Sequence, residues 1–209
     1  MSYLEKKVLE EIQFYVTTKY ACGYLTGQEA QSIVATPYKN INSENFNNLI
    51  NKGFRRSGQY VYKPNCKSCS ACVPIRLLAQ NFTPSKSQKR VRKYLNKLTV
   101  KVLPLTFDEE HYELYVQYQN KRHRNTNEDE DDIADYNDFL IKSNVNSRII
   151  EFRLDNELKI VSIIDLVNEG ISAVYTFYDC DNNKLSLGTI SIIWLLDLCK
   201  RENLKFLYL

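Results

Sequence analysis

Residues 148–178 read RIIEFRLDNELKIVSIIDLVNEGISAVYTFY, and this stretch decides the fold class. Three apolar runs rich in β-branched side chains are separated by two short polar segments, Asp155-Asn156-Glu157 and Asn168-Glu169-Gly170. Runs of this length bounded by turn residues are typical of strands joined by tight turns. We therefore expect three consecutive strands, at Arg148–Leu154, Lys159–Val167 and Ile171–Tyr178.

A helix and a last strand are expected after these three strands. Ser186-Leu187-Gly188-Thr189 opens the helix, which continues through an apolar stretch to Arg201. Lys205 to Leu209 then has the character of a returning strand. Three antiparallel strands, a helix and a returning strand predict an α+β fold, with a mixed sheet flanked by helices.

The N-terminal half predicts shorter elements. Residues 11–36 favour short strands and turns, and Ser43 is a good cap for a helix that runs to Asn51. Residues 54–62 predict a hairpin around Ser57-Gly58. The remaining expected elements are a strand at 73–77, a basic helix capped by Ser85 or Ser87, a strand at 99–103 and a long helix after Thr106.

These elements suggest two domains. We expect a basic, cysteine-containing N-terminal domain over residues 1–103 and a larger domain over 104–209. The acidic segment 125–138 is expected to be a solvated loop. The charged start MSYLEKKVLEEIQ lacks the apolar core of a secretory signal, and no apolar run reaches the length of a membrane span, so we expect a cytoplasmic protein.

Charge is strongly segregated along the chain. No Asp or Glu occurs from Asn45 to Phe107, while thirteen of the 28 Lys and Arg lie between Lys52 and Lys101. The remaining 15 bases stand against all 25 acids, so a segment of about +13 faces a remainder of about −10 behind the net charge of +3. A field of this kind predicts a polyanionic partner.

Three cysteines are spaced two residues apart within the basic segment. Cys66, Cys69 and Cys72 offer three soft ligands, and Cys22 offers a fourth. Four thiolates suit a structural or regulatory Zn²⁺ or an iron–sulfur cluster. The alternative is that these thiols pack or respond to oxidants without binding a metal.

Six blocks of sequence carry a family resemblance. They are GFRRSGQYVYKPNC (53–66), CxxCxxCVPIRL (66–77), FTPSKSQKR (82–90), KRH (121–123), SAVYTFYD (172–179) and SLGT (186–189). In type and order they resemble the bacterial aspartate/glutamate leucyltransferases, which are related to the eukaryotic arginyl-tRNA–protein transferases. The resemblance implies an acyltransferase (GNAT)-like fold. It also implies that leucine passes from leucyl-tRNA to the α-amine of proteins that begin with Asp or Glu, which marks them for degradation.

Two further points follow from the resemblance. Members of the family usually continue past the equivalent of Tyr208-Leu209 with a Gly-Tyr-Trp segment, and lack of that segment is expected to weaken activity. The eukaryotic relatives have been associated with a cluster at related cysteines, which favours a metal at Cys22, Cys66, Cys69 and Cys72. The transfer itself requires no cofactor, because the aminoacyl ester is already activated.

The tRNA is expected to bind through its phosphates. Lys86, Lys89, Arg90 and Lys93 share one face of the basic helix by their three- and four-residue spacing, and Arg55 and Arg56 extend the cationic set. Gly188 and Thr189, at a helix N-terminus, would receive the terminal nucleotides. A basic helix that is merely solvated is the alternative for the first group.

The acceptor and the chemistry call for a second set of residues. Arg76, Arg122 and His123 are candidates to bind the acceptor's acidic side chain. Tyr175, Asp179 and His123 are candidates for catalysis, although core packing is the alternative for Tyr175 and helix capping the alternative for His123.

Other functions remain open at this stage. A nucleic-acid-binding zinc knuckle would account for the basic segment but leaves 172–189 unexplained. An acetyl-CoA-dependent N-acetyltransferase would need a glycine-rich pyrophosphate loop, of which only SLGT is present. The sequence does not decide between leucine and arginine as the transferred amino acid.

Overall fold

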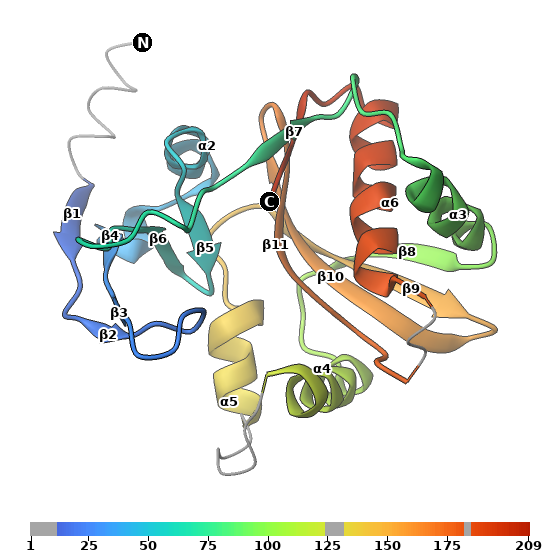
Figure 1. Cartoon of the computed structure of the whole chain (residues 1–209), viewed down its shortest axis with the longest axis horizontal. Coiled ribbons are helices and arrows are strands. Elements are labelled where there is room, and N and C mark those ends of the chain that lie inside the picture. Colours follow the sequence, from blue (N-terminus) through green and yellow to red (C-terminus); the bar gives the residue numbers. More distant parts are fainter. Residues whose placement is uncertain (1–11, 124–131, 182–184) are drawn as a thin grey trace. The chain divides into compact units, whose positions relative to one another are not determined.

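The computed structural model describes residues 12–123, 132–181 and 185–209 of the chain (Figure 1). Internal contacts divide it into two compact units. Unit 1 comprises the described residues up to Ile75 together with Ser143–Val145, and unit 2 comprises the described residues of Arg76–Lys142 and Asn146–Leu209. The division falls at residue 75 and not at the expected 103, because the elements that follow Arg76 join the sheet and core of unit 2.

Unit 1 is built on a small antiparallel sheet. Its strand order is β1-β4-β6-β5, with β1 at Gln13–Val16, β4 at Ser32–Thr36, β6 at Tyr60–Pro64 and β5 at Arg55–Ser57. A second pair is formed by β2 (Tyr20–Ala21) and β3 (Glu29–Ala30), and two helical segments follow β4, namely η1 (Tyr38–Asn40) and α2 (Ser43–Asn51). The predicted hairpin at 54–62 is confirmed as β5 and β6.

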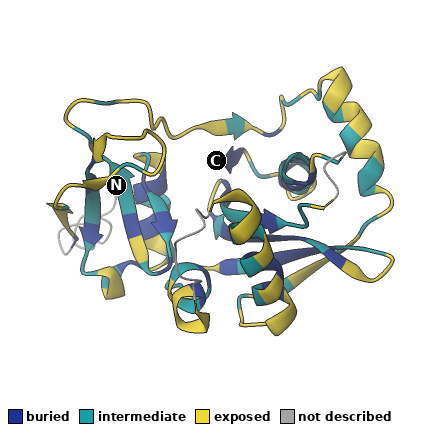
Figure 2. Ribbon diagram, turned by 60° about the horizontal axis from the view of Figure 1, so that its bottom comes forward, coloured by how far each residue is buried: buried dark blue, intermediate teal, exposed yellow. Residues whose placement is uncertain are grey.

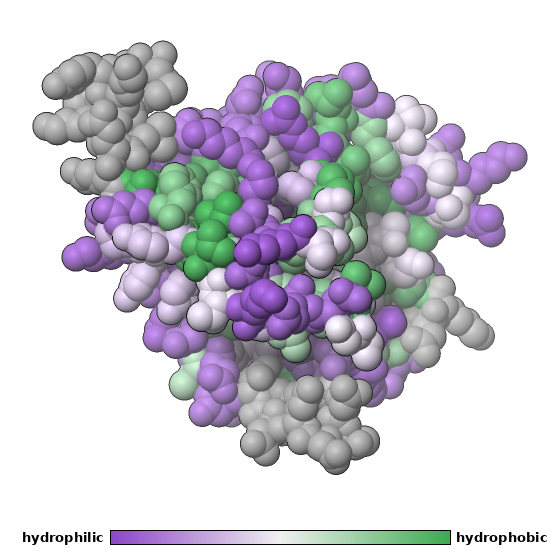
Figure 3. All heavy atoms as spheres, turned by 60° about the vertical axis from the view of Figure 1, so that its left-hand side comes forward, coloured by the Kyte–Doolittle hydropathy of each residue, from purple (hydrophilic) through white to green (hydrophobic). Residues whose placement is uncertain are grey.

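The surface of unit 1 retains several exposed apolar side chains. Phe14, Tyr15 and Val16 of the edge strand β1 are about half exposed, and the ring of Phe14 lies 5.5 Å from that of Phe54. Figure 3 shows hydrophobic side chains gathered in patches between hydrophilic ones on one face of the molecule.

Unit 2 contains a six-stranded mixed sheet, which confirms the predicted α+β class. The strand order is β7-β12-β11-β10-β9-β8, and only the β11–β12 pair is parallel. The strands are β7 (Arg76–Leu78), β8 (Thr99–Pro104), β9 (Ser147–Leu154), β10 (Glu157–Val167), β11 (Gly170–Tyr178) and β12 (Phe206–Tyr208). The three strands expected from 148–178 are therefore β9, β10 and β11.

Helices cover both faces of this sheet. We call the side covered by α6 (Leu187–Arg201) and α3 (Lys86–Leu95) the α6 face. The opposite side, the α4 face, is covered by α4 (Glu109–Arg122), α5 (Ile133–Tyr136) and the π-helical turn η2 (Asn137–Ile141). Alternation along the strands supplies a core to each side, so the central strands β9 to β12 and α6 are mainly buried or half-buried in Figure 2, while α3 is largely exposed.

Several helix starts differ slightly from expectation. Asn42, not Ser43, caps α2, because its side chain accepts a hydrogen bond from Asn45 N. Ser85 caps α3 in a full capping box with Gln88, as one of the two predicted positions. Asp108 caps α4 two residues after Thr106, and the predicted strand at 73–77 forms later, at Arg76–Leu78.

The prediction of an acidic loop at 125–138 needs correction. Residues 125–131, like the charged N-terminal residues 1–11, lie outside the described part of the chain. The remainder enters α5, where Tyr136 is fully buried with its ring 5.0 Å from that of Tyr115. One aromatic side chain thus ties this part of the segment to the core of the α4 face.

β11 and β12 form a short parallel ladder. These strands pair only from Gly170 to Ser172, opposite Phe206 to Tyr208. A Cβ on Gly170 would lie 2.1 Å from Phe206 O, so the strands can approach this closely only because residue 170 is glycine. Beyond Ser172 the register of β11 against β10 shifts, between Ala173 and Tyr175. A bulge at this point re-aims the side chains that follow.

Candidate active site

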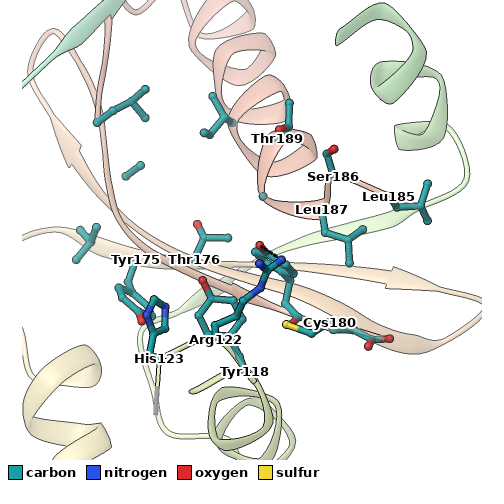
Figure 4. A pocket seen from close by; sticks show the side chains of 17 residues that line it. Tyr118, Arg122, His123, Tyr175, Thr176, Cys180, Leu185, Ser186, Leu187 and Thr189 are labelled. Carbon is teal, nitrogen blue, oxygen red and sulfur yellow. Dashed lines mark hydrogen bonds between the residues drawn. The ribbon is translucent and has the colours of Figure 1, made fainter. Parts of the chain in front are cut away.

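A hollow of about 710 Å³ lies in unit 2 beside the second half of β11. Its walls come from the end of α4, the second half of β11 and the first turns of α6 (Figure 4). A strand, the end of one helix and the N-terminus of another therefore face the same space. Concave sites of this kind are where ligands usually bind.

The N-terminus of α6 forms one wall. Gly188 and Thr189 both line the hollow. Ser186 occupies the N-cap position, but its side chain makes no capping hydrogen bond. It therefore does not bind the first-turn N–H groups that a capping side chain usually binds. Such a terminus attracts anions through its N–H groups and the helix dipole. A Cβ on Gly188 would lie 3.3 Å from Cε1 of Tyr178, so the glycine also permits close packing.

The C-terminal end of α4 supplies the cationic wall. The Arg122 guanidinium donates a hydrogen bond to the Tyr178 hydroxyl at 3.2 Å, and its hydrogen bond to the Cys180 sulfur raises the arginine pKa further. The ring of Tyr118 packs 5.0 Å from that of Tyr178, and burial followed by the neighbouring Tyr178 raises the pKa of the Tyr118 phenol. Arg122 therefore stays charged at the edge of the hollow.

His123 ends the same helix and also lines the hollow. Its backbone N–H donates to Gln119 O at 2.9 Å, so the predicted capping role is present. Its exposed imidazole packs 5.4 Å from the Tyr118 ring and lies in Figure 4 on the same side of the hollow as Tyr175. Capping uses the backbone of His123 and does not involve its ring.

Asp179 lines the hollow as an engaged carboxylate. Lys159 Nζ donates to it at 2.9 Å and Asp181 N donates at 2.8 Å. Burial works against ionisation, yet these hydrogen bonds and the lysine charge together lower the pKa of Asp179 below its usual value. A carboxylate held in this way is a weak base, so a structural role suits it better than proton transfer.

Tyr175 and Thr176 belong to opposite faces of β11. Tyr175 packs edge-on against Phe139 at 5.1 Å and joins the core of the α4 face, so the predicted core-packing role is present, although the residue also lines the hollow. Thr176 donates to Ser162 Oγ at 3.0 Å, and Ser162 shares a 2.6 Å hydrogen bond with Ser191. Both serines are fully buried, so the Thr176 hydroxyl is held by a hydrogen bond from the core side of the strand.

A cationic face lies on α3. Lys86, Lys89, Arg90 and Lys93 are all exposed, and three- and four-residue spacing places them together. Arg92 points elsewhere and pairs with Asp197 at 2.9 Å. Arg90 also lines a smaller hollow of about 370 Å³, which shares Leu185 and Ser186 with the larger one. The two hollows are therefore adjacent.

The structure brings together six of the residues chosen from the sequence. They are Arg122, His123, Tyr175, Asp179, Gly188 and Thr189, all of which line the larger hollow. Arg76 is not among the lining residues; its guanidinium stacks on the Phe206 ring at 4.1 Å.

Two arginines of unit 1 differ from expectation. Arg56 is buried and donates to Gly58 O at 2.7 Å, which corrects its assignment to an exposed tRNA-binding surface. Arg55 donates to the carbonyls of Phe54 and Ile75. These contacts give both side chains a role in holding the hairpin and the segment after it.

The four cysteines proposed as metal ligands do not form a cluster. Cys66, Cys69 and Cys72 lie in an irregular segment, and Cys66 Sγ approaches Gln31 O at 3.7 Å. Within residues 12–123, 132–181 and 185–209, no three His, Cys, Asp or Glu side chains gather as a metal ion requires. As placed, these residues do not fit a zinc ion or an iron–sulfur cluster.

Sequence reasoning missed several lining residues. Tyr118 and Tyr178 line the hollow but were not named as site residues, and neither was Lys159, which holds Asp179 without lining the hollow itself. The signal for Tyr178 lay inside the SAVYTFYD block, but its contact with Arg122 joins residues 56 positions apart. No helix among the described residues is both long and apolar enough to cross a membrane.

The chain is similar to known proteins in sequence over most of its length. Residues 20–90 match the family "Arginine-tRNA-protein transferase, N terminus", and residues 110–209 match "Arginine-tRNA-protein transferase, C terminus". Among solved structures, the chain resembles L-PGS from Bacillus licheniformis with a TM-score of 0.48 and 15% identity, over 65% of this chain and 43% of that one.

Relatives of similar length carry a single name, "Aspartate/glutamate leucyltransferase". The protein of Methylobacillus flagellatus is 49% identical over 96% of this chain and 81% of its own. That of Polynucleobacter asymbioticus is 46% identical over 100% and 87%, and that of Chromobacterium violaceum is 43% identical over 100% and 86%. The chain therefore belongs to the aminoacyl-tRNA–protein transferase family, and it is an enzyme of that family.

Proposed function

We propose that this enzyme transfers leucine from leucyl-tRNA to the N-terminal α-amine of proteins that begin with Asp or Glu. The observation that carries this proposal is the single hollow lined by Arg122, His123 and the N-terminus of α6. The N-terminus of α6 suits an RNA end, Arg122 suits an acidic side chain, and the exposed imidazole of His123 lines the same hollow.

The reaction is aminolysis of an ester. The neutral α-amine of the acceptor attacks the leucyl carbonyl, a C–N bond forms, and the bond from the carbonyl carbon to the ribose oxygen breaks. The proton lost by the amine ends on that ribose oxygen. Because the ester is already activated, the enzyme contributes mainly position and stabilisation of the oxyanion, and we assign no cofactor to the transfer.

The donor is assigned to the α6 and α3 side. Phosphates of the terminal nucleotides suit the N–H groups of the first turn of α6, where Gly188 permits close approach. The smaller hollow lies next to the larger one and is lined in part by Arg90 of α3. To it and to the exposed cations of α3 we assign the phosphates that precede the terminal nucleotides; these cations are Lys86, Lys89, Arg90 and Lys93.

The acceptor is assigned to the end of α4. Arg122 is charged and exposed, its guanidinium carbon lies 5.7 Å from the centre of the Tyr178 ring, and its remaining donors suit a carboxylate in a bidentate pair. His123 is the assigned proton acceptor, since Asp179 is held by Lys159 and Asp181. We assign the acceptor carboxylate to Arg122 and not to Arg76, which lies outside the residues that line the hollow.

Leucine suits the hollow better than arginine as the transferred amino acid. An arginyl side chain would require a carboxylate partner, and Asp179, the one acid among the described lining residues, is already paired. The family relation connects the product with protein degradation. Since the donor is a charged tRNA, we place the reaction in the cytoplasm.

A transfer assay tests this function directly. Leucyl-, arginyl- and phenylalanyl-tRNA are each offered with peptides that begin with Asp, Glu or Ala, and acetyl-CoA replaces the tRNA in a parallel reaction. Leucine transfer to the Asp and Glu peptides, with little to the Ala peptide, is expected. Acetylation, or tight RNA binding without any transfer, would contradict the proposal.

A further inference from the structure

One wall of the larger hollow presents three apolar side chains. Ala173, Ile192 and Leu209 are all half-buried, pack against the core of the α6 face and line the hollow. None of the three assigned substrate-binding groups (Arg122, His123 or the first turn of α6) is an apolar side chain. The proposed mechanism therefore leaves this wall without a role.

Strand register and helix spacing explain why these three side chains meet. Tyr208 pairs with Ser172 in the parallel β11–β12 ladder, so the next residues, Leu209 and Ala173, continue side by side. Alternation directs both to the α6 face, because Leu207 and Ile171 two residues earlier belong to its core. Ile192 lies one helical turn after Gly188 and so on the same side of α6.

We propose that Ala173, Ile192 and Leu209 form a niche that receives the leucyl side chain and selects the transferred amino acid. This inference rests on the proposed function. The niche lies one turn of α6 beyond the glycine to which the RNA end is assigned, so the aminoacyl group reaches it directly. No charged side chain is part of the niche, as an aliphatic ligand requires.

The residue sizes give the niche a capacity that substitutions can change. Ala173 is small, so its strand leaves room for a branched side chain. Replacing Ala173 by Leu fills that room, whereas replacing Ile192 by Ala enlarges it. Apolar pockets discriminate weakly between similar side chains, by about tenfold to 200-fold for each methylene, so the effects are measurable without abolishing binding.

The test uses one tRNA body acylated in turn with valine, leucine or phenylalanine, so that only the side chain varies. In the Ile192→Ala enzyme we expect kcat/KM for the phenylalanyl donor to rise about tenfold relative to the leucyl donor. In the Ala173→Leu enzyme we expect kcat/KM for the leucyl donor to fall about tenfold relative to the valyl donor, with unchanged affinity for uncharged tRNA.

A control separates selection from stability. Leu198 lies on the same helix and packs against the same core but does not line the hollow. Leu198→Ala should lower stability as Ile192→Ala does, with no change in the ratio of donors. The milder Ile192→Val, with a smaller shift in the same direction, serves if Ile192→Ala does not fold.

The outcomes distinguish the two proposals. If the unmodified enzyme transfers no leucine to an Asp peptide, the proposed function fails. If it does, but the niche variants change all three donors equally, the function stands and the niche assignment is overturned. A shift in donor ratio in the Leu198→Ala control would also overturn the assignment, because the effect would then not depend on the wall of the hollow.

Discussion

Arg122 and Tyr178 join the end of α4 to the end of β11. The Arg122 guanidinium donates a hydrogen bond to the Tyr178 hydroxyl at 3.2 Å, and the guanidinium carbon lies 5.7 Å from the centre of the Tyr178 ring. The same phenol ring lies against Gly188 at the start of α6. One aromatic side chain thus contacts both the wall assigned to the acceptor and the wall assigned to the donor.

Arg122 should decide the use of acidic acceptors. In Arg122→Ala we expect kcat/KM for an Asp peptide to fall about 10- to 100-fold, because a hydrogen bond to a charged group contributes about 1.5–3 kcal/mol. Use of a peptide that begins with Ala should change little. Steady-state kinetics on both peptides measure the difference.

Two other arginines serve as comparisons. Arg76→Ala tests the alternative acceptor site, and we expect a smaller loss of discrimination than in Arg122→Ala. Arg201 is exposed on α6 outside the hollow, so Arg201→Ala should behave as the unmodified enzyme. A larger loss in Arg76→Ala than in Arg122→Ala would move the acceptor site to Arg76.

The exposed face of α3 should bind tRNA through charge. Replacing Lys89, Arg90 and Lys93 together by Ala should raise KM for leucyl-tRNA and reduce the slope of log K against log salt by about 2–3, because each phosphate contact contributes about 0.7–0.9 to the slope. Binding titrations over a range of salt concentrations measure the slope.

A charge-matched control accompanies this triple variant. Lys142, Arg201 and Lys205 are exposed cations that line neither hollow. Their combined replacement by Ala should leave the slope nearly unchanged. An unchanged slope in the α3 variant would remove this helix from the tRNA-binding surface.

Gly188 should be required for close packing and not for folding. A methyl group in Gly188→Ala would lie 3.3 Å from the Tyr178 ring, so the ring must shift by a few tenths of an ångström and carry the Arg122 contact with it. We expect a several-fold lower kcat/KM and nearly unchanged thermal stability. Gly23 has open space around its Cβ position, so Gly23→Ala is the matched control.

Acid should weaken the fold through Glu151. This carboxylate is 5% exposed and accepts hydrogen bonds from Arg153 at 2.8 Å and from His111 at 3.0 Å. The Arg153 hydrogen bond, against the opposing effect of burial and with help from His111, lowers the pKa of Glu151 from 4.5 to about 2.

The direction of the pH effect follows from this shift. Because the folded-state pKa is below the unfolded value, Glu151 stabilises the fold above about pH 4.5 and loses that contribution as pH falls toward 2. The contribution is on the order of 3 kcal/mol. Denaturant titrations should show a shallower pH dependence of the unfolding free energy in Glu151→Gln than in the unmodified protein, and no such change in the exposed Glu113→Gln.

Much of the fold could be predicted because its signals are local. The runs in 148–178 form β9, β10 and β11, and the apolar helix after Ser186 forms α6. The boundary between the two units could not be predicted, because β7 joins β12 across more than a hundred residues. A three-residue strand of this kind carries too little pattern to show which sheet it enters.

The candidate site divides in the same way. Arg122, His123, Gly188 and Thr189 lie in blocks that the family resemblance marks, and all four line the hollow. Arg56 lies in another such block, but only the folded chain shows its guanidinium buried against Gly58 O. Sequence reasoning names residue types and spacings, whereas burial depends on which elements pack around them.

The amino-acid sequence by itself determined the α+β class, the segregated charge and the family, because strand periodicity, composition and motif order are properties of neighbouring residues. Only the tertiary structure decided that the end of α4, the second half of β11 and the start of α6 enclose one space. That enclosure depends on how α4 and α6 pack on the two faces of the sheet, and contacts between distant segments are a property of packing in three dimensions.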